Sequence, residues 1–276
     1  MILRRLSMED RIDKEISMRI VVKVGTSTIA HPTGRLNIRH VDQLVRVMAD
    51  LKNAGHELIL VSSGAIGMGV GKLNLKTRPD DIPSKQAAAA VGQCELMYTY
   101  DKLFGSYNHT VGQMLITSED IEDENRRTNF ENTMNRLLEL GAIPVINEND
   151  TTSTSEIRVG DNDTLGAIVA KATGADILIL LSDIDGLYDD NPSVNPDAVL
   201  IRQVDEITEE ITAMAGGAGS EFGTGGMATK IAAARMVTEI GCDMVIINGN
   251  NPERMYDAIE GTVLGTRFSG CKSDPS

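Results

Sequence analysis

Several kinds of residue are scarce in this 276-residue sequence, and each scarcity narrows the possible classes of protein. Tryptophan is absent and aromatic residues make up only 3% of the chain, so a hydrophobic core must be built from Val, Ile, Leu, Ala and Met. Apolar residues reach 41%, which is enough for such a core. The length suits one large α/β domain or two small ones.

Cysteine and histidine are too few, and too widely spaced, to indicate a disulfide framework or a zinc site. The three cysteines, Cys94, Cys242 and Cys271, are odd in number and form no CxxC pair. The four histidines have no spacing typical of metal ligands. We therefore expect a reducing compartment, the cytoplasm, and name no metal-ligating residues.

Long hydrophobic runs and an excess of positive charge are also missing. The run Ile177–Leu181 is far too short to cross a bilayer, and residues 1–18 lack the apolar segment of a secretory signal. The formal net charge of −14 argues against a nucleic-acid partner. We expect contact with neither a membrane nor a nucleic acid, and an anionic small substrate would need local cations to hold it.

Strand-like and helix-like segments alternate along most of the chain. Predicted strands cover 19–24, 57–61, 110–116, 142–146, 176–181 and 243–247, and predicted helices cover 37–54, 84–104, 127–140, 163–173, 208–215, 227–240 and 252–259. This alternation indicates a mainly parallel sheet with helices on both faces, a three-layer αβα sandwich. No linker or repeat is visible, so we expect one domain with one or two lobes.

The stretch Ile146–Ala167 is rich in carboxylates and side-chain amides. Asn147–Asp150 directly follows a predicted strand, where open α/β sheets place their ligand crevice. Gly160–Asp163 directly precedes a predicted helix, where carboxylates and amides can cap the helix and face a ligand. A solvated hairpin over 151–159 is the alternative, and spacing alone does not decide between them.

Two lysines occupy positions that suit a phosphate. Lys23 interrupts a β-branched run and is followed by the donor-rich turn Gly25–Thr28. Lys230 lies about one turn into a predicted helix that follows the glycine-rich loop 223–226, whose amides could approach phosphate oxygens closely. The alternatives are a strand-end lysine that reaches water and a surface lysine after a flexible loop.

A third turn, Ser62–Gly71, also follows a predicted strand. It lacks the Gly-Lys-Ser/Thr of a Walker A loop, and its glycines do not follow the Rossmann pattern. Its hydroxyls and backbone N–H groups at a helix start suit a carboxylate or a phosphate.

Taken together, these motifs resemble those of the amino-acid kinase family, and within it the enzymes that phosphorylate the γ-carboxylate of L-glutamate. The resemblance covers roughly Arg19–Phe268. Its motifs are VVKVGTS at Val21, SSGAIGMG at Ser62, KQAAAAVGQ at Lys85, VGQMLIT at Val111, INEND at Ile146, VGDND at Val159, LLSDIDGLY at Leu180 and GTGGMATK at Gly223. The resemblance implies the amino-acid kinase fold over 19–268, between an N-terminal extension (1–18) and a tail (269–276), without the C-terminal PUA domain of many members.

The implied reaction is ATP-dependent formation of L-glutamyl 5-phosphate from L-glutamate, the first step toward proline. By this resemblance Lys23 and Lys230 would hold the transferring phosphoryl group, and Asp163 would position both ammonium groups. The carboxylate acceptor is ionised at neutral pH, so no general base is needed, which suits a sequence without a compelling histidine.

The resemblance also implies residues that bind the two substrates. Those for glutamate would be Ser63, Asp150 and Asn162. Those for ATP would be Lys23, Ser182, Asp183, Thr224, Gly225, Gly226, Met227, Ala228, Thr229 and Lys230. Mg²⁺ would be bound mainly through the ATP phosphates.

Further implied partners are a second copy of the chain, in a dimer or tetramer, proline as a feedback inhibitor, and a glutamyl-phosphate reductase. The alternatives are another member of the family, such as an N-acetylglutamate or aspartate kinase, and a non-catalytic protein that senses nucleotides or amino acids.

Overall fold

The computed structural model describes residues 17–152, 162–217, 226–262 and 264–271. Their centre is an eight-stranded sheet with the strand order β3-β4-β2-β1-β5-β7-β8-β6. The strands are β1 (Arg19–Val24), β2 (Glu57–Ser62), β3 (Val111–Ile116), β4 (Ile143–Glu148), β5 (Ile177–Ser182), β6 (Gln203–Val204), β7 (Asp243–Asn248) and β8 (Thr266–Phe268). Neighbouring strands are parallel except β7 and β8, so the predicted mainly parallel sheet is confirmed.

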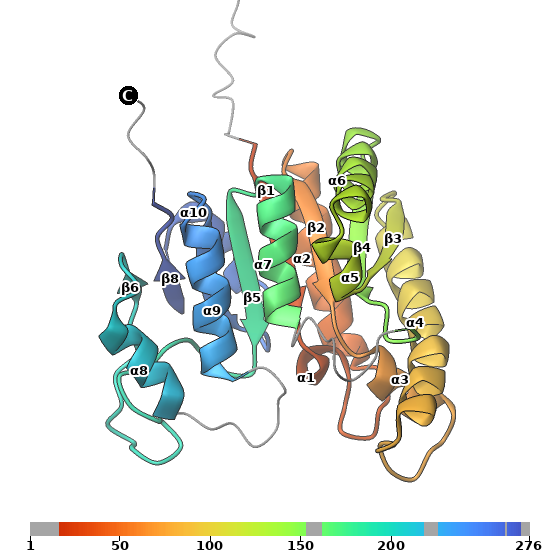
Figure 1. Cartoon of the computed structure of the whole chain (residues 1–276), viewed down its shortest axis with the longest axis horizontal. Coiled ribbons are helices and arrows are strands. Elements are labelled where there is room, and N and C mark those ends of the chain that lie inside the picture. Colours follow the sequence, from red (N-terminus) through yellow and green to blue (C-terminus); the bar gives the residue numbers. More distant parts are fainter. Residues whose placement is uncertain (1–16, 153–161, 218–225, 263, 272–276) are drawn as a thin grey trace, which may run out of the picture.

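Helices cover both faces of this sheet, as the predicted three-layer αβα sandwich requires (Figure 1). The core on one face includes α6 (Glu124–Glu139), α7 (Asn162–Thr173) and α9 (Met227–Thr238). The core on the other face includes α2 (Ile38–Asn53), α4 (Ile82–Gly105) and α10 (Arg254–Glu260). The shorter helices are α1 (Thr26–Ile29), α3 (Ala65–Lys72), α5 (Ser118–Glu122) and α8 (Glu209–Gly217).

The alternation of side chains along β1 decides which layer each residue faces. Ile20, Val22 and Val24 enter the core on the α2 side, whereas Val21 enters the core on the α7 side. Lys23 has the same parity as Val21, so its side chain also faces α7. A Cβ added to Gly166 of α7 would lie 3.4 Å from the Cβ of Lys23, so the glycine lets the helix lie close over this lysine.

The long predicted elements appear in the structure within about one helical turn of their expected ends, a shift that is usual at element boundaries. Four short elements were not predicted: α1, α5, β6 and β8. Each has five residues or fewer, too short to show a hydrophobic period. The hairpin considered over 151–159 lies almost wholly outside the described residues.

Helices α3 and α4 approach each other backbone to backbone. A Cβ on Gly69 would lie 1.8 Å from the carbonyl oxygen of Ala88, and a Cβ on Gly92 would lie 1.8 Å from that of Ala65. Only glycine allows such an approach. Gly69, which belongs to the Ser62–Gly71 segment of the sequence, therefore lies within α3 and is required for the packing of α3 against α4.

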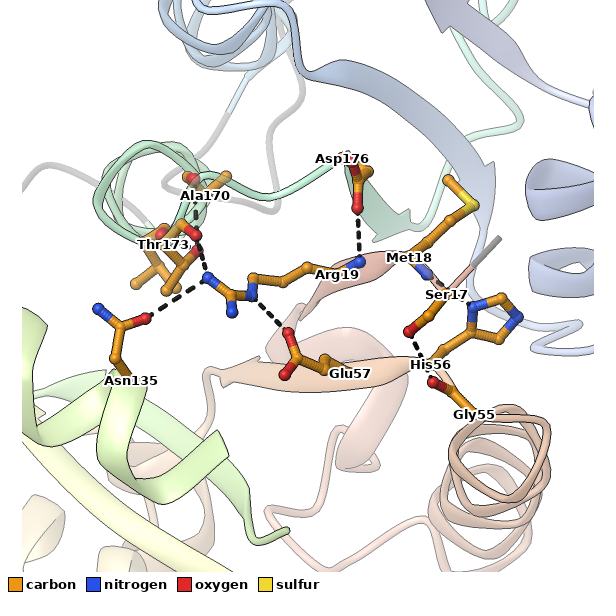
Figure 2. A network of polar contacts seen from close by, with 11 residues as sticks. Ser17, Met18, Arg19, Gly55, His56, Glu57, Asn135, Ala170, Thr173 and Asp176 are labelled. Carbon is orange, nitrogen blue, oxygen red and sulfur yellow. Dashed lines mark hydrogen bonds and ion pairs between the residues drawn. The ribbon is translucent and has the colours of Figure 1, made fainter. Parts of the chain in front are cut away.

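The amino end of β1 is held by a polar network around Arg19 (Figure 2). Its Nε donates to Glu57 Oε2 at 2.8 Å, and its backbone N–H donates to Asp176 Oδ2 at 2.7 Å. Its guanidinium also donates to the carbonyl oxygen of Thr173 and, at 3.4 Å, to Asn135 Oδ1. Thr173 ends α7, and a cation is favourable at a helix C-terminus.

Cys94, Cys242 and Cys271 are all free thiols. Within the described ranges, the helices are each too short or too polar to traverse a bilayer.

Candidate active site

The carboxyl ends of β1, β2, β4, β5 and β7 meet along one edge of the sheet, at the lower side of Figure 1, which we call the carboxyl edge. Val24 pairs with Ser62 of β2 and with Leu181 of β5. Gly25 and Ser63, which directly follow β1 and β2, therefore lie side by side with Ser182, the last residue of β5. Ligands of α/β proteins commonly bind at such an edge.

Asp163 lies fully buried between two lysines at this edge. Its Oδ1 is 2.5 Å from Lys23 Nζ, and its Oδ2 is 2.9 Å from Lys230 Nζ. The lysine side chains are only 11% and 6% exposed. Lys23 comes from the central strand β1, Asp163 from the first turn of α7 and Lys230 from the first turn of α9. The structure thus brings together the three residues that the resemblance implied as catalytic.

The charge on Asp163 is set by opposing effects. Burial alone would raise the pKa of this carboxyl, but the ammonium groups of Lys23 and Lys230, with their hydrogen bonds, outweigh burial and lower the pKa below 3.8. The position in the first turn of α7 also favours a negative charge. One carboxylate against two ammonium groups leaves the trio with a net positive charge, which suits an anion.

A second cluster, built from amides and a hydroxyl, lies beside this trio. Asn162 precedes Asp163 in α7, and its Nδ2 donates to Ser63 Oγ at 2.6 Å and to Asn147 Oδ1 at 3.2 Å. Asn147 Nδ2 in turn donates to Gln93 Oε1 at 2.9 Å. Ser63 and Asn162, predicted as substrate-binding residues, are therefore in direct contact.

Asn147 and Gln93 were not predicted as site residues. Each closes or belongs to a motif of the resemblance, Asn147 in INEND and Gln93 at the end of KQAAAAVGQ, so the sequence contained a signal for both, although periodicity in the Ala-rich helix indicates only burial for Gln93. Asp150, the third predicted glutamate-binding residue, lies partly buried in the turn after β4, also at the carboxyl edge.

The residues predicted to contact ATP fall into two groups. Ser182 ends β5 and donates to Asp183 Oδ1 at 3.2 Å. Thr229 Oγ1 donates to the carbonyl oxygen of Gly226 at 2.7 Å and lies 3.4 Å from Asp163 Oδ2, which links the start of α9 to the buried trio. Met227 is buried and Ala228 exposed at this helix start, and Thr224 and Gly225 lie outside the described residues.

The donor set of the site suits a phosphate better than a directly bound metal. Both oxygens of Asp163 face ammonium groups. In the part of the chain that the structure describes, no three His, Cys, Asp or Glu side chains gather closely enough to hold a metal ion. A divalent cation would fit here as the counterion of a bound polyphosphate.

Comparison with known proteins places this geometry in a family. Residues 18–248 match the model of the "Amino acid kinase family". The chain is 58% identical over 250 residues to a glutamate 5-kinase of Clostridium acetobutylicum, with 91% of this chain and 94% of that protein aligned. It is 54% identical to the glutamate 5-kinase of Clostridium tetani (92% and 95% aligned) and 50% identical to that of Listeria monocytogenes (94% and 95% aligned).

Solved structures with the same fold include more distant kinases. Carbamate kinase from Giardia lamblia, bound to AMP-PNP, superposes with a TM-score of 0.65 at 13% identity, over 92% of this chain and 99% of that one. Isopentenyl phosphate kinase from T. acidophilum gives 0.59 at 19% identity, over 91% and 99%. At these identities the similarity concerns the fold alone. With the family model matched over 18–248 and relatives more than half identical, this chain belongs to the amino acid kinase family.

Proposed function

We propose that this protein transfers the γ-phosphoryl group of ATP to the γ-carboxylate of L-glutamate, the activity after which its similar relatives are named. The products are L-glutamyl 5-phosphate and ADP, and the reaction is the first step toward proline. The observation that carries the proposal is the buried trio of Lys23, Asp163 and Lys230, next to the paired polar side chains of Ser63 and Asn162.

In the proposed reaction a γ-carboxylate oxygen of glutamate attacks the γ-phosphorus of ATP. The bond from that phosphorus to the β–γ bridging oxygen breaks, and its electron pair leaves with ADP. The acceptor has an ordinary pKa of about 4.3, so no proton has to be removed at neutral pH.

The main barrier is repulsion between an anion and a polyanion, because two like charges about 4 Å apart repel by about 4 kcal/mol at an effective dielectric constant of about 20. Lys23 and Lys230 would neutralise charge on the transferring group, and Asp163 would position both ammonium groups. Mg²⁺, carried on the ATP phosphates, would supply further neutralisation.

The remaining roles follow from position at the carboxyl edge. Ser63 and Asn162 would hold the polar groups of glutamate, and Asp150 would pair with its α-ammonium group. The ATP phosphates would lie against the start of α9, and Ser182 and Asp183, at the carboxyl end of β5, would contact ATP as well. The loop residues Thr224 and Gly225 would complete this contact.

Partners and setting are part of the same proposal. We propose a kinase domain over 19–268 and a cytoplasmic setting, which the free thiols favour. A homo-oligomer would form through the exposed side of α4 around Ala87–Met97, next to the 62% exposed Tyr98. Proline would inhibit by competing with glutamate, and the unstable acyl phosphate product would pass to a glutamyl-phosphate reductase.

Hydroxylamine trapping tests the activity directly, since an acyl phosphate reacts with it to give a hydroxamate. Purified protein with ATP, Mg²⁺ and L-glutamate should form glutamyl hydroxamate, and omission of ATP should abolish the product. N-acetyl-L-glutamate and L-aspartate serve as matched acceptors and should give much less. ATP binding in calorimetry without any hydroxamate would overturn the proposal.

A further inference from the structure

A chain of four hydrogen-bonded side chains runs from α4 to the carboxyl edge. Gln93 Oε1 accepts from Asn147 Nδ2 at 2.9 Å, Asn147 Oδ1 accepts from Asn162 Nδ2 at 3.2 Å, and Ser63 Oγ accepts from the same Nδ2 at 2.6 Å. Gln93 and Asn147 are only 7% and 3% exposed, whereas Ser63 and Asn162 are half-buried. The two buried side chains of this hydrogen-bonded series therefore support the two that are proposed to touch glutamate.

One backbone group fixes the donor and the acceptor of each hydrogen bond in this series of side chains. The N–H of Glu148, which can only donate, points to Asn147 Oδ1 at 2.9 Å. The oxygen of Asn147 is thereby fixed on this side, and its Nδ2 faces Gln93, which has to offer an oxygen. By the same reasoning the atom of Asn162 that faces Asn147 Oδ1 has to be the nitrogen.

This direction decides what the outer pair offers to a ligand. An asparagine nitrogen carries two hydrogens, and those of Asn162 are directed to Asn147 and Ser63. Asn162 therefore presents its Oδ1, an acceptor, to a ligand. The hydroxyl oxygen of Ser63 already accepts a hydrogen bond, so its single O–H can donate to a ligand. One acceptor beside one donor complements an ammonium group beside a carboxylate.

Gln93 holds the buried end of the chain with its oxygen alone. Its Nε2 is buried and has no hydrogen-bond partner among the described residues. An unpaired buried donor is unfavourable, and an apolar residue of similar size would avoid it. The oxygen of Gln93 is thus the part of this side chain that the interior uses.

We propose that Gln93 is a positioning residue for the amino-acid substrate. By accepting from Asn147 it keeps the amide of Asn147 in one orientation, which makes Asn162 an acceptor and Ser63 a donor toward the amino acid. The inference rests on the proposed binding of glutamate at Ser63 and Asn162, which Gln93 affects without touching the substrate.

Steady-state kinetics of Gln93 variants test this role, with KM for L-glutamate measured separately from KM for ATP. Gln93→Met removes the acceptor at similar volume and should raise KM for glutamate about tenfold, equivalent to about 1.4 kcal/mol, with kcat and KM for ATP little changed. Gln93→Glu retains an oxygen toward Asn147, so KM for glutamate should stay near the wild-type value even though the buried carboxylate lowers stability. Leu96→Val, a buried change on the same helix without a hydrogen bond, is the control for lost stability.

An isosteric pair of variants keeps the proposal testable if Gln93→Met does not fold. In Asn147→Asp, Gln93 can turn its amide and donate with Nε2, so KM for glutamate should change little. In the double variant Gln93→Glu/Asn147→Asp, two carboxylates face each other and neither can donate a hydrogen bond. KM for glutamate should then rise about tenfold at pH 8, far more than the two single effects combined. Additive effects, or an unchanged KM in Gln93→Met, would overturn the positioning role. If the wild-type protein itself forms no glutamyl hydroxamate, the proposed function is wrong, and the role of Gln93 is not what has failed.

Discussion

Strand β1 carries a cation at each end, and the two cations lie in different environments. Arg19 and Lys23 have the same parity and both reach α7, which lies over the strand. Arg19 contacts the last residue of α7, its side chain is 26% exposed, and its partner Glu57 is 38% exposed. Lys23 contacts the first turn of α7, is 11% exposed, and pairs with a fully buried carboxylate.

This difference separates a contact that supports the fold from one suited to chemistry. A half-exposed ion pair contributes about 0–1 kcal/mol and costs little to form. A buried arrangement of three charges has a large desolvation cost, and such arrangements gather where a protein acts on a ligand. The amino end of β1 therefore serves to hold α7 in place, and the carboxyl edge is where we place phosphoryl transfer.

The largest expected effect is the loss of stability in Asp163→Asn. Removal of the carboxylate leaves the ammonium groups of Lys23 and Lys230 buried together without a counterion, so the free energy of unfolding should fall by about 3–5 kcal/mol. Urea unfolding followed by circular dichroism measures this. Asp176→Asn, which removes a carboxylate at the amino end of β1, should lower the free energy of unfolding much less. Equal losses in the two variants would contradict the distinction between the two ends of β1.

Next in size is the effect of Lys230→Met on turnover. The variant lacks one of the two cations proposed to neutralise the transferring group, so kcat should fall by about 10²- to 10³-fold. The hydroxamate assay gives this value, with folding checked by circular dichroism. Arg19→Met, which removes a cation from the opposite end of β1, is the matched control and should leave kcat within about twofold. A Lys230→Met enzyme with normal kcat would contradict the proposed role.

A smaller effect is expected for Asp150→Ala. If Asp150 pairs with the α-ammonium group of glutamate, its removal should raise KM for glutamate about tenfold and leave kcat nearly unchanged. Initial rates over a range of glutamate concentrations give both constants. Equal KM values in variant and wild type would exclude this contact.

The pH dependence of stability sharpens the comparison further. Because the pKa of Asp163 lies below its ordinary value of 3.8 in the folded protein, the unfolded chain takes up this proton more readily. The stabilisation is therefore present above about pH 4 and is lost as pH falls through the lowered pKa. Urea unfolding between pH 5 and 3 should show a steeper decline for wild type than for Asp163→Asn. Parallel curves would mean that the charge on Asp163 is not favoured by folding.

The smallest expected effect is that of Arg19→Met on the fold. Its contacts with Glu57, Asn135 and the end of α7 are partly exposed, so the free energy of unfolding should fall by about 1 kcal/mol. Chemical denaturation measures it, and addition of salt should weaken the wild-type contribution. A loss as large as that in Asp163→Asn would show that exposure does not separate the two ends.

The sequence was sufficient to predict the six long strands and the long helices, and the resemblance to the amino-acid kinase family implied the trio of charged residues. The local contexts of these three residues can be recognised in the sequence. Lys23 lies within a β-branched run, and Asp163 and Lys230 lie near helix starts. The contact between Gln93 and Asn147 joins residues 54 positions apart. Hydrophobic periodicity is a local signal, so it cannot predict which distant polar side chains will pair. Strand β8 was missed because three residues are too few to show a period and its antiparallel partner is set by the tertiary fold.

The close approach of α3 and α4 has a consequence for protein engineering. The separation of these helices is set by main-chain atoms at Gly69 and Gly92, and α4 carries Gln93 while α3 begins just after Ser63. Attempts to widen the acceptor range by replacing these glycines would move both helices as units. Substitutions at neighbouring solvent-facing positions can vary widely and still leave this spacing intact.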